Sequence, residues 1–460
     1  MRIVIVGAGA VGFNLAAELS REGYDIAVIE NDRNLVKRIQ DKLDVQVVRG
    51  SGTEVSALKE AKVENAELLI AVTNIDEVNQ VVCMMAHAFN VRRKIARVRT
   101  KDFTDKNPIL SKRDFHINRM INPEEITIDY ILKVMETPGA SDAGDFAEGE
   151  ILLRGFHITS GAGLHDQPLS ELKVKYHDIP FLIAAIQRKD GIIIPKGTDV
   201  LKVGDTVYLL MTREVLPKIQ EMLSAEYYKV NKVIVAGAGR IGLDLARRLE
   251  GRVDSLALVD EDEDLCHAAS TVLSKALVVR GDPLDDEVMH EVRLGDADFF
   301  IATHEDDQKN LIHAMLAKKK GVKRTAIVAK DPDIVQILGS LDVDVVVNSR
   351  LIAVSEILRF VKPGKVLSVK KIGDSEAEII EIVVGKSSKA ISKSLRELKL
   401  PKGALIGAIY RNGMAIIPDG NSVIEPGDTV VAFVLPKVNK KLERLLVGRE
   451  RITFIESKGK

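Results

Sequence analysis

A tandem α/β fold, in which two parallel-sheet domains are each followed by a small α+β domain, is predicted by three features of the sequence. The chain has 460 residues, whereas a single core stops growing at roughly 250–300 residues, so several domains are expected. Short apolar runs alternate with segments of helical periodicity, which predicts parallel strands joined by right-handed crossovers. The pattern then recurs in the second half of the chain, which predicts a duplicated module.

Composition narrows the class of protein further. Hydrophobic residues make up 46% of the chain and charged residues 29%, the balance of a globular protein. Lys and Arg number 66 against 67 Asp and Glu, so the net charge of −1 argues against a nucleic-acid partner. Cys83 and Cys266 are far apart and have no further Cys or His at ligand spacing. We therefore expect a reducing compartment, no metal site and, since no apolar run is long enough, no membrane insertion.

The internal repeat is the main organising feature. Residues 7–12 read GAGAVG and residues 237–242 read GAGRIG, an offset of 230 (237 − 7). Two further pairs keep this offset: Glu30 with Asp260, and Thr73 with Thr303. Farther along, residues 204–207 and 427–430 both read GDTV, at an offset of 223 (427 − 204). The repeat therefore covers a whole two-domain module.

Four domains follow from this repeat. We predict Rossmann-like nucleotide-binding domains over residues 1–136 and 228–364, and small α+β domains over 137–227 and 365–455. Within the first module, parallel strands are expected at Ile3–Val6, Tyr24–Ile29, Val45–Val48 and Leu68–Val72, and shorter hairpin strands at Ile183–Ile186, Gly191–Ile194 and Thr206–Met211. Gly, Ala, Ser and Asp cluster from Pro138 to Gly149, which predicts a linker.

The first glycine-rich loop carries a complete dinucleotide-binding pattern. It follows a strand, opens a helix, and is followed by Glu30, 18 residues after its last glycine (30 − 12). Gly7 permits the tight turn, Gly9 lets a pyrophosphate approach the backbone, and Gly12 allows close helix–strand packing. The amides that would meet the phosphates belong to the loop residues Gly7, Ala8, Gly9, Ala10, Val11 and Gly12. Glu30 would bind the ribose hydroxyls and repel a 2′-phosphate, which favours NAD(H) or an adenine nucleotide over NADP.

The second loop repeats this arrangement with one change. Its residues are Gly237, Ala238, Gly239, Arg240, Ile241 and Gly242, and the acid is Asp260. Arg240 replaces the small Ala10 and could either clamp a phosphate or fill the site. A purely structural second copy therefore stays open.

Further candidates lie beyond the carboxyl ends of the next strands, where such sheets bind ligands. Thr73 and Asn74 follow the fourth strand of the first copy, and Thr303 and His304 are their expected equivalents; all four are ligand contacts or ordinary loop caps. Arg97 and Arg99 are two residues apart and therefore lie on the same face of a strand. Because the strand is largely buried, both need anionic partners, either phosphates or carboxylates. In the second copy Lys330 stands near the Arg99 position and Val328 replaces Arg97, so the first site is expected to be the more complete.

Catalytic groups that recur in both copies are missing from the sequence. An oxidoreductase needs an acid–base group and a substrate domain, but the small domains have roughly 80 residues each, little for a substrate lid. His87, His157, His165 and His177 have no counterparts at matching offsets. We therefore expect a binding protein and not an enzyme, with an NAD-dependent oxidoreductase and a non-binding scaffold subunit as the alternatives.

These motifs together resemble those of the Trk family of potassium-uptake regulatory subunits. Besides the two loops with their acids, the resemblance includes Ala71–Asn74 with Asp76, Ile121–Glu124, and Glu136–Ala140. It extends over nearly the whole chain, as two RCK N-terminal and two RCK C-terminal domains. Ser51 follows Gly50 where many RCK domains carry an acid, whereas Asp282 follows Gly281 in the second copy.

The resemblance implies a regulatory role in potassium transport. By it, Gly7 to Gly12, Glu30, Thr73, Asn74, Arg97 and Arg99 would hold the first ligand, and Gly237 to Gly242, Asp260, Thr303, His304 and Lys330 the second. The ligands would be NAD(H), ATP or ADP. The resemblance also implies a homotetrameric ring in the cytoplasm, peripheral at the inner face of the membrane beneath a membrane-embedded potassium-translocating subunit.

Overall fold

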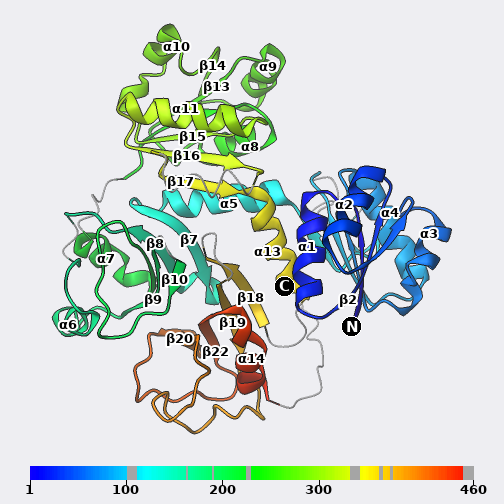
Figure 1. Ribbon diagram of the computed structural model, residues 1–460. Helices are drawn as coiled ribbons and strands as arrows, with labels where there is room; N and C mark the ends of the chain where they lie inside the picture. The colour runs from blue at the N-terminus through cyan, green and yellow to red at the C-terminus, as the bar shows by residue number, and fades with distance from the viewer. Residues whose placement is uncertain are drawn as a thin grey trace. The chain divides into compact units, whose positions relative to one another are not determined.

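The computed structural model describes residues 1–100, 111–161, 164–188, 191–223, 229–331, 342–361, 366–372 and 377–448. The chain divides into two compact units (Figure 1). Unit 1 comprises Met1–Thr127 and Ser349–Val361, and unit 2 comprises the rest of the chain. Each unit is described by itself below.

Unit 1 is built on a parallel six-stranded sheet in the order β3-β2-β1-β4-β5-β6. Its strands are β1 (Arg2–Val6), β2 (Asp25–Glu30), β3 (Gln46–Arg49), β4 (Leu68–Ala71), β5 (Arg93–Arg97) and β6 (Arg119–Ile121). Its own helices are α1 (Ala10–Arg21), α2 (Arg33–Lys42), α3 (Val55–Glu60), α4 (Asp76–Ala88) and the start of α5 (Pro123–Met135). The strand order reverses between β1 and β4, and a ligand crevice is expected outside the carboxyl ends of the strands at that point.

Apolar side chains cover both faces of this sheet, as the continuous apolar strands predict. On one face Ile3, Ile5 and Ile70 pack with α1, and on the other Val4 and Leu69 pack with α3 and α4. A helix on each side of a parallel sheet is the doubly wound arrangement. The predicted fold class is confirmed for this domain.

Helix α13 (Ser349–Val361) also belongs to unit 1, although it follows the second parallel sheet in sequence. Its apolar face, including Ala353, Ile357 and Val361, is buried in the same core as α1. Figure 1 shows the two helices side by side. Conversely, α5 begins in unit 1 and runs into unit 2 from Ile128 on. Helix α13 of the second module therefore packs on the first Rossmann domain, which the local sequence pattern does not reveal.

Unit 2 contains the second parallel sheet, in the order β14-β13-β12-β15-β16-β17. Its strands are β12 (Lys232–Ala236), β13 (Ser255–Asp260), β14 (Leu277–Arg280), β15 (Phe299–Ala302), β16 (Arg324–Ala329) and β17 (Val345–Asn348). The helices are α8 (Arg240–Leu249), α9 (Glu263–Val272), α10 (Asp286–Glu291) and α11 (Asp307–Lys319). The order matches that of the first sheet strand for strand, so the predicted duplication is confirmed.

The two small domains each contain a five-stranded antiparallel sheet, in the orders β10-β9-β11-β8-β7 and β18-β19-β22-β20-β21. The first comprises β7 (Ala140–Phe146), β8 (Ile151–His157), β9 (Phe181–Arg188), β10 (Gly191–Ile193) and β11 (Thr206–Thr212) with α6 (Leu169–Lys175) and α7 (Leu216–Met222). The second comprises β18 (Val366–Lys371), β19 (Glu378–Val383), β20 (Ala404–Arg411), β21 (Met414–Ile416) and β22 (Thr429–Val434) with α14 (Asn439–Val447). Side chains of both sheets, among them Leu210 and Phe433, form one buried cluster, so the small domains pack on each other.

The prediction of a linker from Pro138 to Gly149 was wrong. Residues 140–146 form the edge strand β7, which pairs antiparallel with β8. The small and acidic residues that suggested a linker have tertiary partners, because Asp145 forms an ion pair of 2.9 Å with the fully buried Arg154. Arg154 also donates to Thr137 Oγ1 and to the Gly144 carbonyl. A buried guanidinium requires such partners, and they hold the strand in place.

Candidate functional site

The first glycine loop connects β1 to α1, and two of its three glycines are required by close contacts. Gly7 has φ +100°, and a Cβ there would lie 2.9 Å from the Thr73 amide nitrogen. A Cβ on Gly12 would lie 1.9 Å from the Gly7 carbonyl oxygen, so only glycine lets α1 approach the loop. Gly9 differs, because nothing lies within 4 Å of its ideal Cβ position. Space is therefore open over Gly9, where the pyrophosphate is expected.

The second loop reproduces this geometry. Gly237 has φ +103°, a Cβ on Gly242 would lie 1.8 Å from the Gly237 carbonyl oxygen, and Gly239 has open space beside it. In both loops the residue before the helix is a glycine without a capping side chain, so backbone N–H groups of the first turn stay available to an anion. Ala8 and Ala238, the second residues of the two loops, are buried, and Val11 packs in the core.

Each predicted acid is tied to its glycine loop. Glu30 Oε2 accepts from the Ala8 amide at 2.5 Å, and its Oε1 accepts from the amides of Asn31 and Asp32 at 2.7 and 2.9 Å. Asp260 repeats this with the amides of Ala238 (2.6 Å) and Asp262 (2.9 Å). A carboxylate offers about four acceptor positions, so each acid keeps capacity for a ribose hydroxyl.

Two buried asparagines that the sequence reasoning missed hold the next strand ends together. Asn79 Oδ1 accepts from the Thr73 amide and hydroxyl at 2.9 and 2.8 Å, and its Nδ2 donates to the carbonyls of Thr73 and Arg97 at 3.1 and 2.9 Å. Asn310 makes the equivalent bonds to His304 and Val328. The available signal was their separation of 231 residues (310 − 79), which matches the repeat after the third strand.

This pairing corrects the expected equivalence of Thr73 and Thr303. From β4 onward the two copies differ by 231 residues and not 230, because the second copy has one more residue between the ends of its second and third strands. Thr73 therefore corresponds to His304, and Thr303 to Val72. The Thr303 hydroxyl is buried and donates to the carbonyls of Ala236 and Gly237 at 3.1 and 2.9 Å. Thr303 supports the loop from beneath and is not placed to contact a ligand.

The two arginines of the first site have different partners. Arg99 forms an ion pair of 3.3 Å with Asp76 and donates from Nη2 to the Asn74 carbonyl at 2.6 Å. Asp76 is almost fully buried and also accepts from the amides of Arg99 and Thr100. Arg97 Nη1 donates to Asn74 Oδ1 at 3.2 Å, whereas its buried Nε has no hydrogen-bond partner within the described residues. Of the two alternatives, Arg99 has the carboxylate, and Arg97 keeps hydrogen-bonding capacity for a phosphate.

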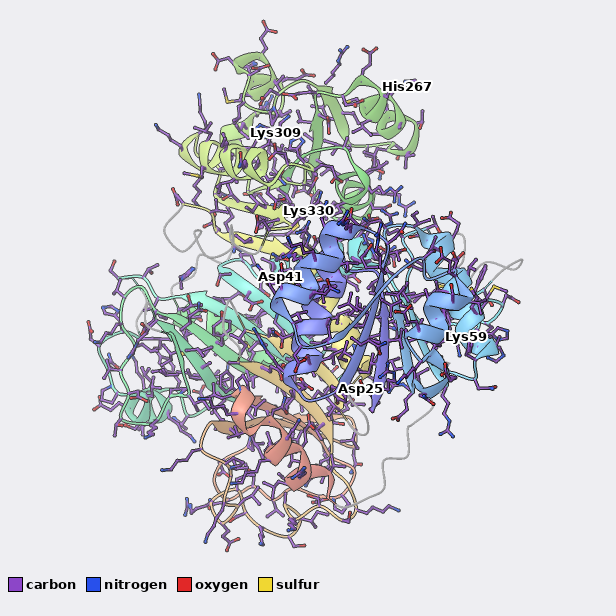
Figure 2. All side chains as sticks on the ribbon, turned by 45° about the vertical axis from the view of Figure 1, so that its right-hand side comes forward. Asp25, Asp41, Lys59, His267, Lys309 and Lys330 are labelled. Atoms are coloured by element: carbon purple, nitrogen blue, oxygen red, sulfur yellow. The ribbon has the colours of Figure 1, made fainter. Side chains whose placement is uncertain are left out.

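The charges of the second site are mostly neutralised by the protein itself. Lys330 forms an ion pair with Glu305, and Lys309 pairs with Glu261 at 2.6 Å; both lysines are labelled in Figure 2. Asp307, the counterpart of Asp76, accepts from the backbone amides of Lys330 and Asp331 through Oδ2. Arg240 is exposed at the first position of α8. The second site therefore has the loop and the acid, and both of these lysines form ion pairs within the described residues.

Two neighbouring histidines distinguish the second site from the first. The rings of His304 and His313 are edge-to-face with centroids 5.1 Å apart, and His313 Nε2 lies 3.6 Å from Asp282 Oδ1. The pKa of His304 is lowered to about 4, chiefly by burial and also by the charges of Lys309 and His313, whereas Asp260 and Glu261 act to raise it. His304 is consequently neutral at pH 7.

The low pKa of His304 predicts a loss of stability in acid. An unfolded histidine titrates near 6.5, so between pH 6.5 and about 4 the unfolded chain binds the additional proton and the free energy of unfolding falls as the pH falls. We expect His304→Gln to reduce this loss by about 1–3 kcal/mol, allowing for the partial exposure of the ring. Urea unfolding of the wild type and the variant at pH 7.5 and pH 4.5 would measure it. An equal loss in both proteins would contradict the assignment.

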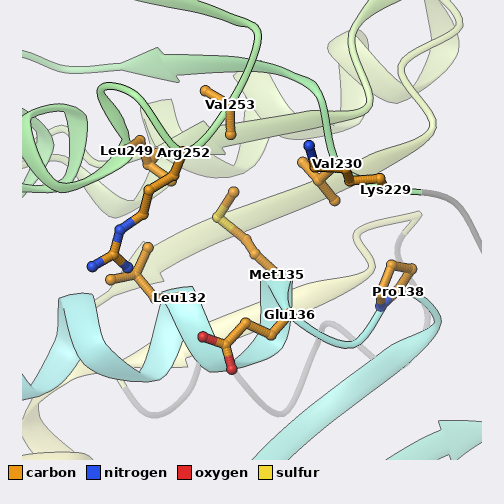
Figure 3. A pocket seen from close by; sticks show the side chains of 9 residues that line it. All are labelled: Leu132, Met135, Glu136, Pro138, Lys229, Val230, Leu249, Arg252 and Val253. Atoms are coloured by element: carbon orange, nitrogen blue, oxygen red, sulfur yellow. The ribbon is translucent and has the colours of Figure 1, made fainter. Parts of the chain in front are cut away.

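A cavity of about 220 Å³ in unit 2 is lined by no residue of either glycine loop. Figure 3 shows Leu132 and Met135 of α5 facing Leu249 and Val253, with Glu136 and Arg252 among the other lining residues. The cavity thus marks where α5 packs near the end of α8. None of the predicted site residues lines it.

Fold and site geometry define a class of protein with two nucleotide-binding-type Rossmann domains, each followed by a small antiparallel domain. Two family models match the chain. The TrkA-N domain matches residues 3–123 and 233–349, and the TrkA-C domain matches residues 153–224 and 379–447.

Full-length relatives have the same organisation. The chain is 32% identical over 450 residues to the Trk system potassium uptake protein TrkA of Azorhizobium caulinodans, covering 97% of this chain and 98% of the relative. It is 31% identical over 450 residues to the protein of the same name from Halomonas elongata, with the same coverage. The chain belongs to the TrkA family.

Solved structures share the fold at lower identity. The GsuK RCK domain aligns with a TM-score of 0.60 at 17% identity, covering 97% of this chain and 94% of that one. A GsuK channel described as bound to NAD aligns with the same TM-score and identity over 97% of this chain and 78% of its own. Among the described residues, no helix has the length and apolar character needed to cross a membrane.

Proposed function

We propose that this protein is the nucleotide-sensing regulatory subunit of a Trk-type potassium uptake system and not an enzyme. The observation that carries the proposal is the open space over Gly9 and Gly239, between free helix amides and an acid tied to each loop. Its relatives are named for potassium uptake, and a neighbour of the same fold is described as bound to NAD. The proposed ligands are NAD(H), ATP and ADP.

A bound nucleotide would contact groups at the ends of several strands of the same sheet. In the first site the loop after β1, the acid of β2, Thr73 after β4 and Arg97 at the end of β5 belong to separate strands that converge on one edge. A nucleotide that contacts several of them stabilises the conformation that fits it best. A ligand shifts an equilibrium only by its differential affinity for the two states, so two sites per chain can add their effects.

The partner is proposed to be a membrane-embedded potassium-translocating subunit, at the cytoplasmic face of the membrane. The regulatory chain would assemble as a homotetrameric ring. Helices α4 and α11, which are equivalent in the two modules, expose apolar side chains of the kind that assembly buries. They are Val81, Met84, Ile312 and Leu316, each 40–54% exposed.

Glu30→Ala provides a direct test of the first site. Removing the carboxylate leaves the ribose hydroxyls and the Ala8 amide without their acceptor, so we expect NADH and ATP to bind about 1–3 kcal/mol more weakly there. Asp260→Ala should have the same effect at the second site. Asp25→Ala is the matched control, because Asp25 lies at the opposite end of β2 and pairs with Arg2 (Figure 2).

The regulatory role is tested by potassium flux in proteoliposomes that contain the membrane subunit and this protein. Flux should change when ATP, ADP or NADH is added, and the change should be smaller with the Glu30→Ala and Asp260→Ala proteins than with Asp25→Ala. Light scattering of the purified chain should give the mass of four copies. If the membrane subunit neither binds this protein nor responds to nucleotide in its presence, the proposal is wrong.

A further inference from the structure

Helix α13 is a candidate for coupling ligand binding at the first site to unit 2. It is buried against α1 and lies next to β6, both in unit 1. Asn348, which directly precedes the helix, belongs to unit 2, and so do the described residues from Val366 on. Helix α13 is therefore joined to unit 2 through the chain at its N-terminal end.

The register of α13 is fixed by contacts along β6. Arg119, at the start of the strand, pairs with Glu356 at 3.3 Å and stacks on the ring of Phe360 at 4.5 Å. The helix rises about 1.5 Å per residue, so Arg350 in the first turn lies about 9 Å from Glu356 along the axis. Arg350 acts electrostatically on Arg97, which pairs with Ile121 at the carboxyl end of β6, so the N-terminal end of α13 lies on this side of the sheet.

A cluster of charges is the result. Three guanidinium groups, from Arg97, Arg99 and Arg350, share this edge with the carboxylates of Asp76 and Glu124. The pKa of Arg97 is lowered chiefly by burial and then by Arg99, with Glu124 and Asp76 opposing and Arg350 lowering it again. Among these five side chains three are cations and two are anions, and Arg97 Nε is buried without a hydrogen-bond partner in the described part of the chain. Such a cluster is completed by an anion.

Glu124 and Arg350 occupy matching places in the two modules. Asn122-Pro123-Glu124 follows β6 and begins α5, whereas Asn348-Ser349-Arg350 follows β17 and begins α13. Helix α13 of the second module packs on the first Rossmann domain and carries Arg350 in its first turn. The equivalent residue of the first module's own helix, α5, is the acid Glu124. This reversal of charge is present only at the first site, since only α13 carries it.

We infer that Arg350 binds the terminal phosphate of a nucleoside di- or triphosphate held at the first site, so that helix α13 of the second module senses the phosphate charge of that ligand. The inference rests on the proposed function, because it needs a nucleotide at this loop. NAD(H) has no terminal phosphate, since its diphosphate is esterified at both ends. Arg350 therefore separates ATP and ADP from NAD(H) at one and the same loop, and only the free polyphosphates engage α13.

The test compares ligands and variants by calorimetry on the full-length chain in a Gly239→Ala background, which confines binding to the first site. Arg350→Gln should weaken ATP at least 10-fold and ADP to a similar extent, while NADH and AMP change less than 2-fold. Arg350→Lys should restore part of the ATP affinity. Arg359→Gln, at the opposite end of α13, is the matched control and should leave all four ligands unchanged.

Hydrogen exchange distinguishes a phosphate-binding role of Arg350 from a purely structural one. ATP, but not NADH, should slow exchange in the first turns of α13, and Arg350→Gln should remove this difference with an unchanged thermal midpoint. Equal ATP affinity in the wild type and in Arg350→Gln would overturn the inference and leave the proposed function standing. A wild-type chain that binds none of the four ligands would instead overturn the proposed function itself.

Discussion

Replacing Gly9 with alanine is expected to abolish nucleotide binding at the first site without destabilising the fold. Gly9 has φ −55° and ψ −177°, a conformation that alanine adopts readily, and apart from its two chain neighbours no described residue lies within 4 Å of the new Cβ. The methyl group would occupy the space in which the pyrophosphate meets the backbone. We expect affinity for NADH and ATP to fall at least 100-fold, because a displaced diphosphate loses several charge-assisted bonds of about 1.5–3 kcal/mol each.

Gly12→Ala is the informative comparison, because there the same methyl group acts on the fold. The Cβ would lie 1.9 Å from the Gly7 carbonyl oxygen, so α1 and the loop must move apart. We expect a loss of about 3 kcal/mol in the free energy of unfolding, as for other overpacked sites. Circular dichroism in urea and calorimetry with NADH would separate the two effects. A Gly9→Ala protein that binds NADH normally would show that the ligand does not pass over this loop.

Asp76→Ala is expected to produce the largest loss of stability among the site residues. Asp76 is almost fully buried and accepts from the amides of Arg99 and Thr100 as well as from the Arg99 side chain. Removing the carboxylate leaves two amides without an acceptor and a partly buried guanidinium without its counter-ion, at a cost of about 3–5 kcal/mol. The first site should lose its ligand too, since Arg99 would no longer be oriented.

Asp307→Ala in the second module is the matched control for this prediction. Asp307 accepts from the amides of Lys330 and Asp331, but the Lys330 ammonium pairs with Glu305 instead. We therefore expect a smaller loss, about 1–3 kcal/mol. Urea unfolding monitored by hydrogen exchange in each parallel sheet would assign each loss to its domain. Equal losses for the two variants would contradict the role given to the Arg99–Asp76 ion pair.

Local chemistry explains which parts of this protein could be predicted from its sequence. The glycine loops and their acids are short motifs with a fixed spacing, and each glycine is required by backbone geometry within one strand–turn–helix unit. The apolar strands were predictable for a similar reason, because strands buried on both faces are continuously apolar. Their observed bounds, such as Asp25–Glu30 for β2, differ from the predicted ones by a residue.

The features that were missed depend on residues distant in sequence. The segment from Pro138 to Gly149 looked like a linker, but Arg154 and the neighbouring strand make it β7. Helix α13 has an ordinary apolar face, and nothing in that pattern tells which of two similar sheets it covers. Asn79 was overlooked because its role depends on the ends of two strands that are distant in sequence, and these become visible only in the fold.

Titration calorimetry of the wild-type chain with NADH, ATP and ADP, beside the double variant Gly9→Ala/Gly239→Ala, tests the central claim most directly. The account predicts saturable heats for the wild type, with binding at the first loop in every chain, and no heat for the double variant at the same concentrations. Wild-type protein that takes up none of these nucleotides, or a double variant that binds them as well as the wild type, would contradict it.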